Sequence, residues 1–317
     1  MKVEALTATC LDEAAELLAA TQRAGEGPAS GVWRASAAAE VIAASLPGAL
    51  ALAAMERGVL VGFLVVPLPG APGADPVRIL DHHHAADPGR ARDAYRALYA
   101  PAAASLVGFG CFHHVVRVLI EPPGAVQAFG ELGFGVDQIK GVQPLGSRLS
   151  ATGEPGEAGL DDVDELVSLY IELATYHARS PVLRPAALDV AATRSELVDT
   201  VEDPRRTILV ARDGRRIIGM IEAHPDARHL DTVTIGLNIV TERARSRGVG
   251  TALLDGVLGW GLDAGYRHCA VSWASANLVS DAFYRARGFV PFRYELVRRI
   301  DPEVSWANER LDYSLLG

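Results

Sequence analysis

The stretch TVTIGLNIVTERARSRGVGTALLDG, residues 232–256, decides the fold of this chain. Its first nine residues are mostly β-branched or apolar, which predicts a strand over 232–240. The apolar spacing that follows predicts a helix over 250–264, closed by Gly265. A strand that runs through a glycine-containing turn into a helix aims free backbone N–H groups and the positive end of the helix dipole at one point. The segment therefore predicts an anion site.

The turn itself, Arg-Ser-Arg-Gly-Val-Gly at residues 245–250, suits a pyrophosphate. Gly248 and Gly250 let the main chain approach a phosphate without an intervening Cβ, and Arg245 and Arg247 add positive charge at the rim. The turn has neither the Lys-Ser or Lys-Thr pair of a P-loop nor the third glycine of a dinucleotide fingerprint. CoA is therefore the leading ligand, and an ordinary tight turn is the alternative that these six residues leave open.

A second motif follows the turn: Asn277 precedes a predicted helix that carries Phe283-Tyr284 and ends in Gly288-Phe289. The two motifs in this order resemble the GNAT superfamily of acyl-CoA-dependent N-acyltransferases, over residues 160–300. The resemblance implies that acetyl-CoA is a co-substrate and that its acetyl group passes directly to a primary amine in a ternary complex. It implies CoA contacts from the backbone amides of the turn, from the strand that would hold the pantetheine, and from the asparagine: Arg245, Arg247, Gly248, Val249, Gly250 and Thr251, then Ile239 and Val240, then Asn277.

Acyl transfer to an amine requires a neutral amine, stabilisation of an oxyanion and a proton for the leaving thiolate. The resemblance implies that Tyr284 supplies this proton, and a packed core aromatic is the alternative. Strand alternation makes Glu222 a candidate base for the substrate ammonium, with Asp231 and His224 behind it. Each of the three is equally well explained as a hydrogen-bonded residue at the end of a strand.

Tyr176 and His177 end the first predicted helix of the second half, where the family commonly shapes its acceptor site. That helix is predicted over 162–178, with a capping box formed by Asp162 and Glu165. The acceptor is expected to be a small-molecule amine such as an amino sugar, polyamine or amino acid. A protein N-acetyltransferase and a non-catalytic acetyl-CoA-binding regulatory module are the alternatives.

A shift of about 155 residues aligns the two halves of the chain, which indicates a diverged tandem repeat. The predicted fold class is α/β (α+β), with two tandem GNAT-like domains, each a twisted mixed sheet flanked by helices. The domains are expected at 1–150 and 159–317, joined by a linker at 150–159, with the last strand at 290–299. The size and tandem arrangement resemble the mycothiol synthase type, which implies nothing about the substrate.

The first half lacks the residues of the proposed site. At the same shift, residues 245–250 fall on 90–95, where both glycines are lost and Asp93 would repel a phosphate. Tyr284 falls on Phe129, which has no hydroxyl group. The first half is therefore expected to be a structural domain that does not turn over acetyl-CoA.

Composition limits the other function classes. The formal net charge of −9 disfavours nucleic acid and anionic membranes as partners. A charged turn at residues 56–58 divides the apolar stretch 46–70, which indicates a buried hairpin and no membrane span.

His82, His83 and His84 alternate in direction along a strand, so no metal site is expected. Three widely spaced cysteines and no signal-peptide pattern favour a cytoplasmic protein, either a monomer or a homodimer.

Overall fold

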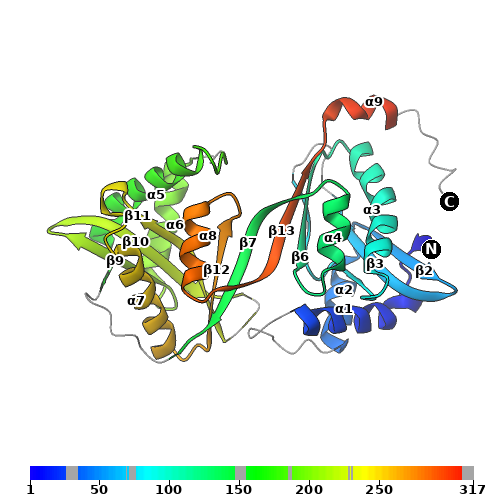
Figure 1. The fold of residues 1–317 in the computed structure, drawn as a ribbon, viewed down its shortest axis with the longest axis horizontal. Coiled ribbons are helices and arrows are strands. Elements are labelled where there is room, and N and C mark those ends of the chain that lie inside the picture. Colours follow the sequence, from blue (N-terminus) through cyan, green and yellow to red (C-terminus); the bar gives the residue numbers. More distant parts are fainter. Residues whose placement is uncertain are drawn as a thin grey trace. The chain divides into compact units, whose positions relative to one another are not determined.

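A computed structural model describes residues 1–25, 35–68, 70, 76–146, 155–184, 188–227, 229 and 231–308 of the 317-residue chain. The chain forms two compact units (Figure 1). Unit 1 comprises Met1–Ile139 and Pro291–Gly317, and unit 2 comprises Lys140–Val290. This division differs from the expected 1–150 and 159–317, because the boundary comes earlier and the last residues fall in unit 1. The expected linker lies partly outside the described residues.

Unit 1 contains two groups of paired strands with helices packed on them. The strands β1, β2, β3 and β5 pair in that order, and β4 and β13 pair with β6. The elements of this unit are β1 (Lys2–Ala5), α1 (Leu11–Gly25), α2 (Ala35–Ser45), β2 (Ala49–Glu56), β3 (Val59–Pro67), β4 (Val77–Ile79), β5 (His84–Ala86), α3 (Ala91–Gly108), β6 (His113–Leu119) and α4 (Gly124–Glu131).

The hairpin β2–β3 confirms the reading of the apolar stretch as buried strands. Its turn is made by Arg57 and Gly58, whose φ angles are 54° and 82°. Most side chains of β3 are buried on both faces of the sheet. No helix in the described part of the chain is both long and apolar enough to cross a bilayer.

Unit 2 carries a sheet in the order β7-β12-β11-β10-β9-β8, covered on both faces. Helices α5 and α6 pack on one face through the core around Leu166, Leu197 and Met220. Helix α7 packs on the other face, where Gly219 gives room to Leu253. The elements are β7 (Gly135–Pro144), β8 (Gly156–Glu157), α5 (Val163–His177), α6 (Val190–Glu202), β9 (Thr207–Asp213), β10 (Arg216–Pro225), β11 (Thr232–Val240), α7 (Val249–Asp263), β12 (His268–Ala274) and α8 (Leu278–Ala286). The strand that follows them, β13 (Val290–Arg299), belongs to unit 1 from Pro291 onward.

The two halves of the chain exchange their last strands. Strand β13, from the second half, pairs antiparallel with β6 in unit 1, from Arg293 opposite Leu119 to Arg299 opposite His113. Strand β7, from the first half, lies next to β12, and a Cβ on its Gly141 would come within 2.8 Å of Trp273. In the sequence, the first residues of β6 and β12 are 155 positions apart, and so are their last residues. The same spacing separates β7 from β13. This spacing agrees with the repeat predicted from the sequence.

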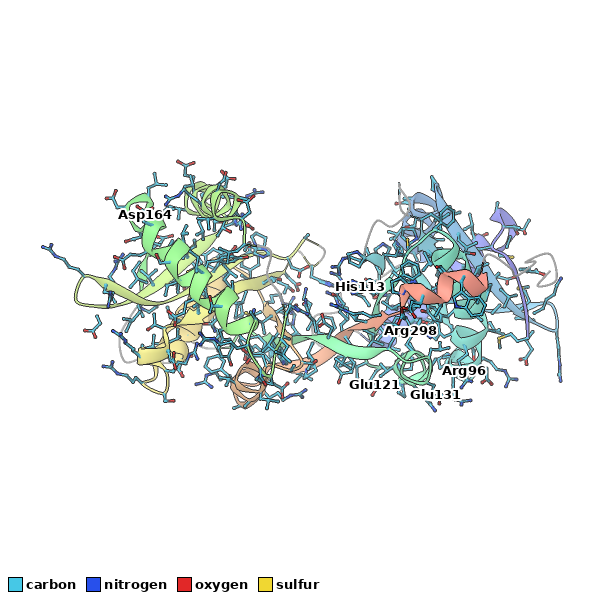
Figure 2. The ribbon with its side chains drawn as sticks, turned by 90° about the horizontal axis from the view of Figure 1, so that it is seen from above. Arg96, His113, Glu121, Glu131, Asp164 and Arg298 are labelled. Atoms are coloured by element: carbon cyan, nitrogen blue, oxygen red, sulfur yellow. The ribbon has the colours of Figure 1, made fainter. Side chains whose placement is uncertain are left out.

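Ion pairs on the helix surfaces join neighbouring helices within each unit (Figure 2). In unit 1, Arg96 on α3 pairs with Glu131 on α4. In unit 2, Arg194 on α6 pairs with Asp164 on α5. Exposed pairs of this kind contribute little to stability, because solvent screens the two charges.

The predicted capping box of α5 does not form. Asp162 accepts from the backbone N–H of Gly159 at 2.9 Å. Glu165 accepts from the backbone N–H of Ile217 at 2.7 Å, so its carboxylate binds the start of β10 and does not cap its own helix. The prediction was wrong because a nearby strand offered a free donor.

Candidate active site

The turn before α7 presents a cluster of free backbone amides. Gly248 caps the helix in the left-handed region with φ 82°, and Ser246 also has a positive φ, 61°. Within the described residues, no protein acceptor takes the amide hydrogens of residues 246–251. The first turn of a helix leaves such donors unsatisfied, and together with the dipole they favour an anion.

Strands β11 and β12 separate before the chain reaches this turn. Their parallel pairing ends at Ile235 and Val271. At the same level the register between β10 and β11 shifts, with a bulge between Ile221 and Ala223. Beyond this point the edge of β11 that faces β12 is open, which leaves strand backbone available to a ligand with amide groups.

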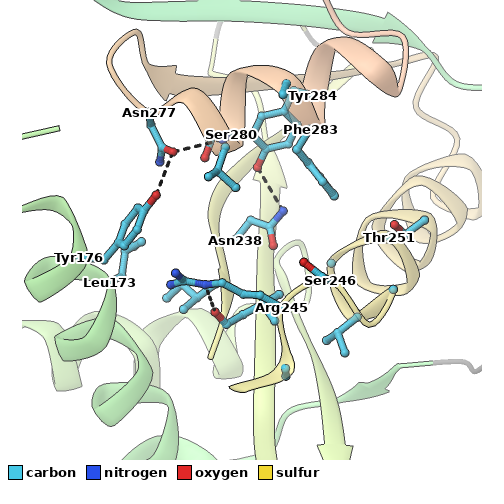
Figure 3. Close-up of a pocket in the computed structure, with 18 of the residues that line it drawn as sticks. Leu173, Tyr176, Asn238, Arg245, Ser246, Thr251, Asn277, Ser280, Phe283 and Tyr284 are labelled. Atoms are coloured by element: carbon cyan, nitrogen blue, oxygen red, sulfur yellow. Dashed lines mark hydrogen bonds between the residues drawn. The ribbon is translucent and has the colours of Figure 1, made fainter. Parts of the chain in front are cut away.

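A cavity of about 730 Å³ lies over the open edge and the turn (Figure 3). Side chains from α5, β11, the turn, the start of α7 and α8 surround it. Its lining comprises Glu172, Leu173, Tyr176, Asn238, Ile239, Val240, Ala244, Arg245, Ser246, Gly248, Val249, Gly250, Thr251, Asn277, Val279, Ser280, Ala282, Phe283, Tyr284 and Arg287.

Tyr284 enters this cavity from α8, with only 5% of its surface exposed. Its ring packs against Trp273 and Phe289, with centroids 5.4 Å away in both cases. Its hydroxyl oxygen accepts from Nδ2 of Asn238 at 3.2 Å (Figure 3). Burial raises the pKa of the phenol to about 12, while the bond from Asn238 acts in the opposite direction. The phenol is therefore a proton donor throughout the neutral range.

Asn277 closes the cavity at the start of α8. Its Oδ1 accepts from the backbone N–H of Ser280 at 3.2 Å, which caps the helix, and from the hydroxyl of Tyr176 at 3.4 Å. The guanidinium of Arg245 lies 4.7 Å from the centre of the Tyr176 ring, and its Nε donates to the carbonyl of Val240 at 3.2 Å. These contacts hold one cation at the mouth of the cavity (Figure 3).

Most residues predicted for the site meet in this cavity. They are Ile239, Val240, Arg245, Gly248, Val249, Gly250, Thr251, Asn277 and Tyr284. Arg247 does not line it, and its side chain is exposed. Glu222 does not line it either.

The structure disfavours Glu222 as the base. Nη2 of Arg206 donates to its Oε1 at 2.7 Å, and the pair is largely buried. Its other oxygen lies against β11, 2.5 Å from where a Cβ of Gly236 would be. The Glu222 carboxylate is thus held in an ion pair and lies outside the cavity lining. Strand alternation predicts the direction of a side chain and not its partner, so the sequence does not reveal the ion pair between Glu222 and Arg206.

The weaker candidates for the base also lie outside the cavity lining. Nδ1 of His224 is 2.9 Å from the carbonyl oxygen of Pro225. The carboxylate of Asp231 lies 3.5 Å from Nδ1 of His268. His177, unlike Tyr176, is not among the lining residues, and burial lowers its pKa.

Arg287 is a cavity residue that sequence reasoning missed. Its guanidinium stacks on Phe283, 3.8 Å from the ring centre, and also donates to the hydroxyl of Thr251. Its Nη1 donates to the carbonyl of Phe283 at 3.3 Å, and its buried Nε has no partner among the described residues. It thus places a second fixed cation beside the first turn of α7. The one sequence signal was its position one residue before Gly288-Phe289.

The corresponding region of unit 1 is built differently. Helix α3 begins at Ala91, so the residues that match the turn of unit 2 are already helical. Phe129, which matches Tyr284, is fully buried, with ring centroids 5.4 Å from Tyr95 and 6.0 Å from Tyr99. Nδ1 of His84 lies 3.0 Å from the hydroxyl of Tyr95, and its Nε2 lies 2.8 Å from a backbone carbonyl oxygen. Packed aromatic rings therefore occupy this part of unit 1.

The chain is similar to known proteins in sequence over part of its length and in fold over most of it. Residues 172–289 match the family model described as the acetyltransferase (GNAT) family. A GCN5-related N-acetyltransferase from Sphaerobacter thermophilus has a TM-score of 0.56 and 19% identity, over 94% of this chain and 95% of that one. A GNAT-family acetyltransferase from Colwellia psychrerythraea has a TM-score of 0.50 and 13% identity, over 95% and 100%.

A tandem GNAT protein from the clavulanic acid biosynthesis pathway has a TM-score of 0.50 and 18% identity, over 93% of this chain and 96% of that one. No curated protein matches the chain. These neighbours share the fold across both halves, so the predicted pair of tandem GNAT-like domains, each a twisted mixed sheet flanked by helices, is confirmed. The second half of this chain thus matches the acetyltransferase (GNAT) family model, and the whole chain has the fold of its structural neighbours.

Proposed function

We propose that unit 2 binds acetyl-CoA and transfers its acetyl group to the primary amine of a small molecule. One observation carries the proposal: the free amides of residues 246–251, the open edge of β11 and the buried hydroxyl of Tyr284 all border one cavity. The amides and Arg245 suit the pyrophosphate, and the strand edge suits the amide groups of pantetheine. Asn277 would contact the arm of CoA.

The chemistry requires one new bond and one broken bond. The neutral amine attacks the thioester carbon, the nitrogen of the adduct loses a proton to solvent, the C–S bond breaks with its electron pair on sulfur, the thiolate receives the proton of Tyr284, and solvent returns a proton to the tyrosinate. Since Glu222 is held by Arg206, the proposed mechanism assigns the ammonium proton to water. Unit 1 is proposed to be structural, since Phe129 offers no hydroxyl and packed rings surround it.

An assay of free CoA separates this proposal from its alternatives. An enzyme releases CoA from acetyl-CoA in the presence of glucosamine, spermidine or lysine. The product then exceeds the starting amine in mass by one acetyl group in place of a hydrogen. A regulatory module binds acetyl-CoA with the same affinity and releases nothing. Release with peptide amines only would indicate a protein N-acetyltransferase.

Gly248→Glu is expected to abolish acetyl-CoA binding. The variant places a carboxylate where the phosphates would lie, at a residue with φ 82°. Acetyl-CoA at about 100 times its dissociation constant should stabilise the wild-type unit by roughly 2.7 kcal/mol, and this stabilisation should be absent in the variant. Differential scanning fluorimetry with and without acetyl-CoA measures both.

A matched control is Gly265→Glu, at the other end of α7. Gly265 has a φ of 85°, so this substitution causes similar backbone strain away from the cavity. It should lower the melting temperature and keep the shift caused by acetyl-CoA. An equal loss of the shift in both variants, or no shift in the wild type, would refute the site.

Arg287→Gln is expected to weaken CoA binding by roughly tenfold to a hundredfold, because a hydrogen bond to a charged group contributes about 1.5–3 kcal/mol. Isothermal titration calorimetry with CoA and with dephospho-CoA measures the loss and shows which phosphate the guanidinium contacts. Arg285→Gln is the control, since this exposed residue pairs with Asp281 on the same helix and does not line the cavity. Equal affinities for the wild type and Arg287→Gln would exclude the contact.

A further inference from the structure

Asn238 lies on the open edge of β11 and contacts Tyr284, the residue proposed to protonate the leaving thiolate. It lies on β11 beyond Ile235, the last residue paired with β12. Its backbone pairs on the other side with Ile221 of β10, so the sheet fixes its position. Its side chain lines the cavity and reaches Tyr284 on α8 (Figure 3).

The hydrogen bond between these side chains has a definite polarity. Nδ2 of Asn238 is the donor and the hydroxyl oxygen of Tyr284 is the acceptor, at 3.2 Å. An amide nitrogen can only donate, so the phenol keeps its own hydrogen for another acceptor. No residue in the described part of the chain accepts that hydrogen.

Among the described residues, Asn238 is the side chain that hydrogen-bonds to the hydroxyl of Tyr284. The tyrosine ring contacts Trp273, Phe283 and Phe289. The titratable group that acts on it is the buried thiol of Cys269 on β12, whose own pKa is raised by burial. Asn238 is thus the polar side chain that orients the hydroxyl.

We propose that Asn238 is a positioning residue that turns the hydroxyl of Tyr284 so that its proton points to the leaving sulfur of acetyl-CoA. The inference rests on the proposed function. As the tetrahedral adduct collapses, the C–S electron pair moves to sulfur, the phenolic proton passes to it, and solvent then returns a proton to the tyrosinate. During the transfer the Nδ2 donor also stabilises the negative charge on the phenolic oxygen.

The test uses the full chain, acetyl-CoA and hydroxylamine, a small nucleophile that needs no acceptor pocket. Asn238→Ala should lower kcat by about tenfold and leave the dissociation constant of acetyl-CoA within about threefold, since the bond is made to the phenol and not to the ligand. In a Tyr284→Phe background the same substitution should have almost no further effect on kcat, because the group that it positions is absent.

Asn238→Asp reverses the polarity of the contact. An ionised carboxylate accepts the phenolic hydrogen and draws it away from the sulfur, so kcat should fall further than in Asn238→Ala. Measured relative to the wild type at each pH, the activity of Asn238→Asp should rise as the pH falls, because the protonated carboxyl can again donate. A residue with a merely structural role would not produce this dependence.

Three results would overturn the inference. Equal losses from Asn238→Ala in the wild-type and Tyr284→Phe backgrounds would show that Asn238 does not act through the tyrosine. A higher activity for Asn238→Asp than for Asn238→Ala at neutral pH would exclude the proposed polarity. If the wild type binds acetyl-CoA and releases no CoA with hydroxylamine or any amine, the proposed function fails and this inference fails with it.

Discussion

Tyr284→Phe is expected to lower kcat for acetyl transfer by about a hundredfold to ten-thousandfold, the range typical of removing one general acid. The substitution deletes a single oxygen and keeps the ring that packs against Trp273 and Phe289. We therefore expect the affinity for acetyl-CoA and the melting temperature to change little. Steady-state kinetics by CoA release, with a binding titration on the same samples, measures both quantities.

The pH profile gives a second check on this role. An ordinary phenol loses its proton near pH 10. Burial raises the pKa of Tyr284 to about 12, so the donor form persists at higher pH than an exposed tyrosine would allow. The wild-type kcat should show no loss from this group up to about pH 11. A fall in kcat centred near pH 10 would argue for an exposed phenol.

Tyr266→Phe is the matched control. Tyr266 packs against Trp260 with centroids 6.1 Å apart, and it does not line the cavity. The control should keep the full kcat. If Tyr284→Phe also keeps it, the proton of the thiolate comes from another source and the alternative reading of this residue as core is correct.

Local chemistry made much of the site predictable. The turn needs a left-handed residue, and only glycine adopts that conformation without strain, which identifies Gly248. Asn277 was predicted to precede a helix, and in the structure its side chain caps that helix. Strand β13 begins and ends where the apolar pattern predicted.

Contacts between distant segments were not predictable in the same way. Asn238 is a single polar residue in a strand, and nothing near it in the sequence indicates that Tyr284 lies opposite. Arg287 reads as a surface charge on a helix until the fold brings Thr251 beside it. The ion pair of Glu222 was equally hidden in the sequence, since its partner Arg206 comes from the residues before β9.

The strand exchange is the largest departure from the predicted organisation. A strand with alternating apolar residues fits the edge of either of two similar sheets, and the pattern does not say which. In a tandem repeat the two similar sheets belong to one chain, so the strand can pair with the edge of either sheet. The sequence therefore predicted β13 as a strand and assigned it to the second domain, while the structure pairs it with β6 in unit 1.

Leu296→Ala should accordingly destabilise unit 1 and leave the acetyl-CoA site intact. Leu296 lies on β13 opposite Val116 of β6, is 2% exposed, and belongs to the same core as Phe129 and Tyr99. Truncating a buried leucine to alanine costs about 2–5 kcal/mol. Hydrogen exchange should become faster in peptides from β6 and remain unchanged in peptides from β11, and the thermal shift caused by acetyl-CoA should persist.

Leu253→Ala provides the opposite pattern. Leu253 is fully buried on α7 in unit 2, so its truncation should speed exchange in α7 and β10 and lower the transition that acetyl-CoA raises. If Leu296→Ala instead loosens α7 and weakens acetyl-CoA binding, then β13 supports unit 2, as the sequence pattern predicted. If the two variants separate as expected, the last strand of the acetyltransferase half stabilises the half that lacks the site, and neither half can be removed without exposing a sheet edge of the other.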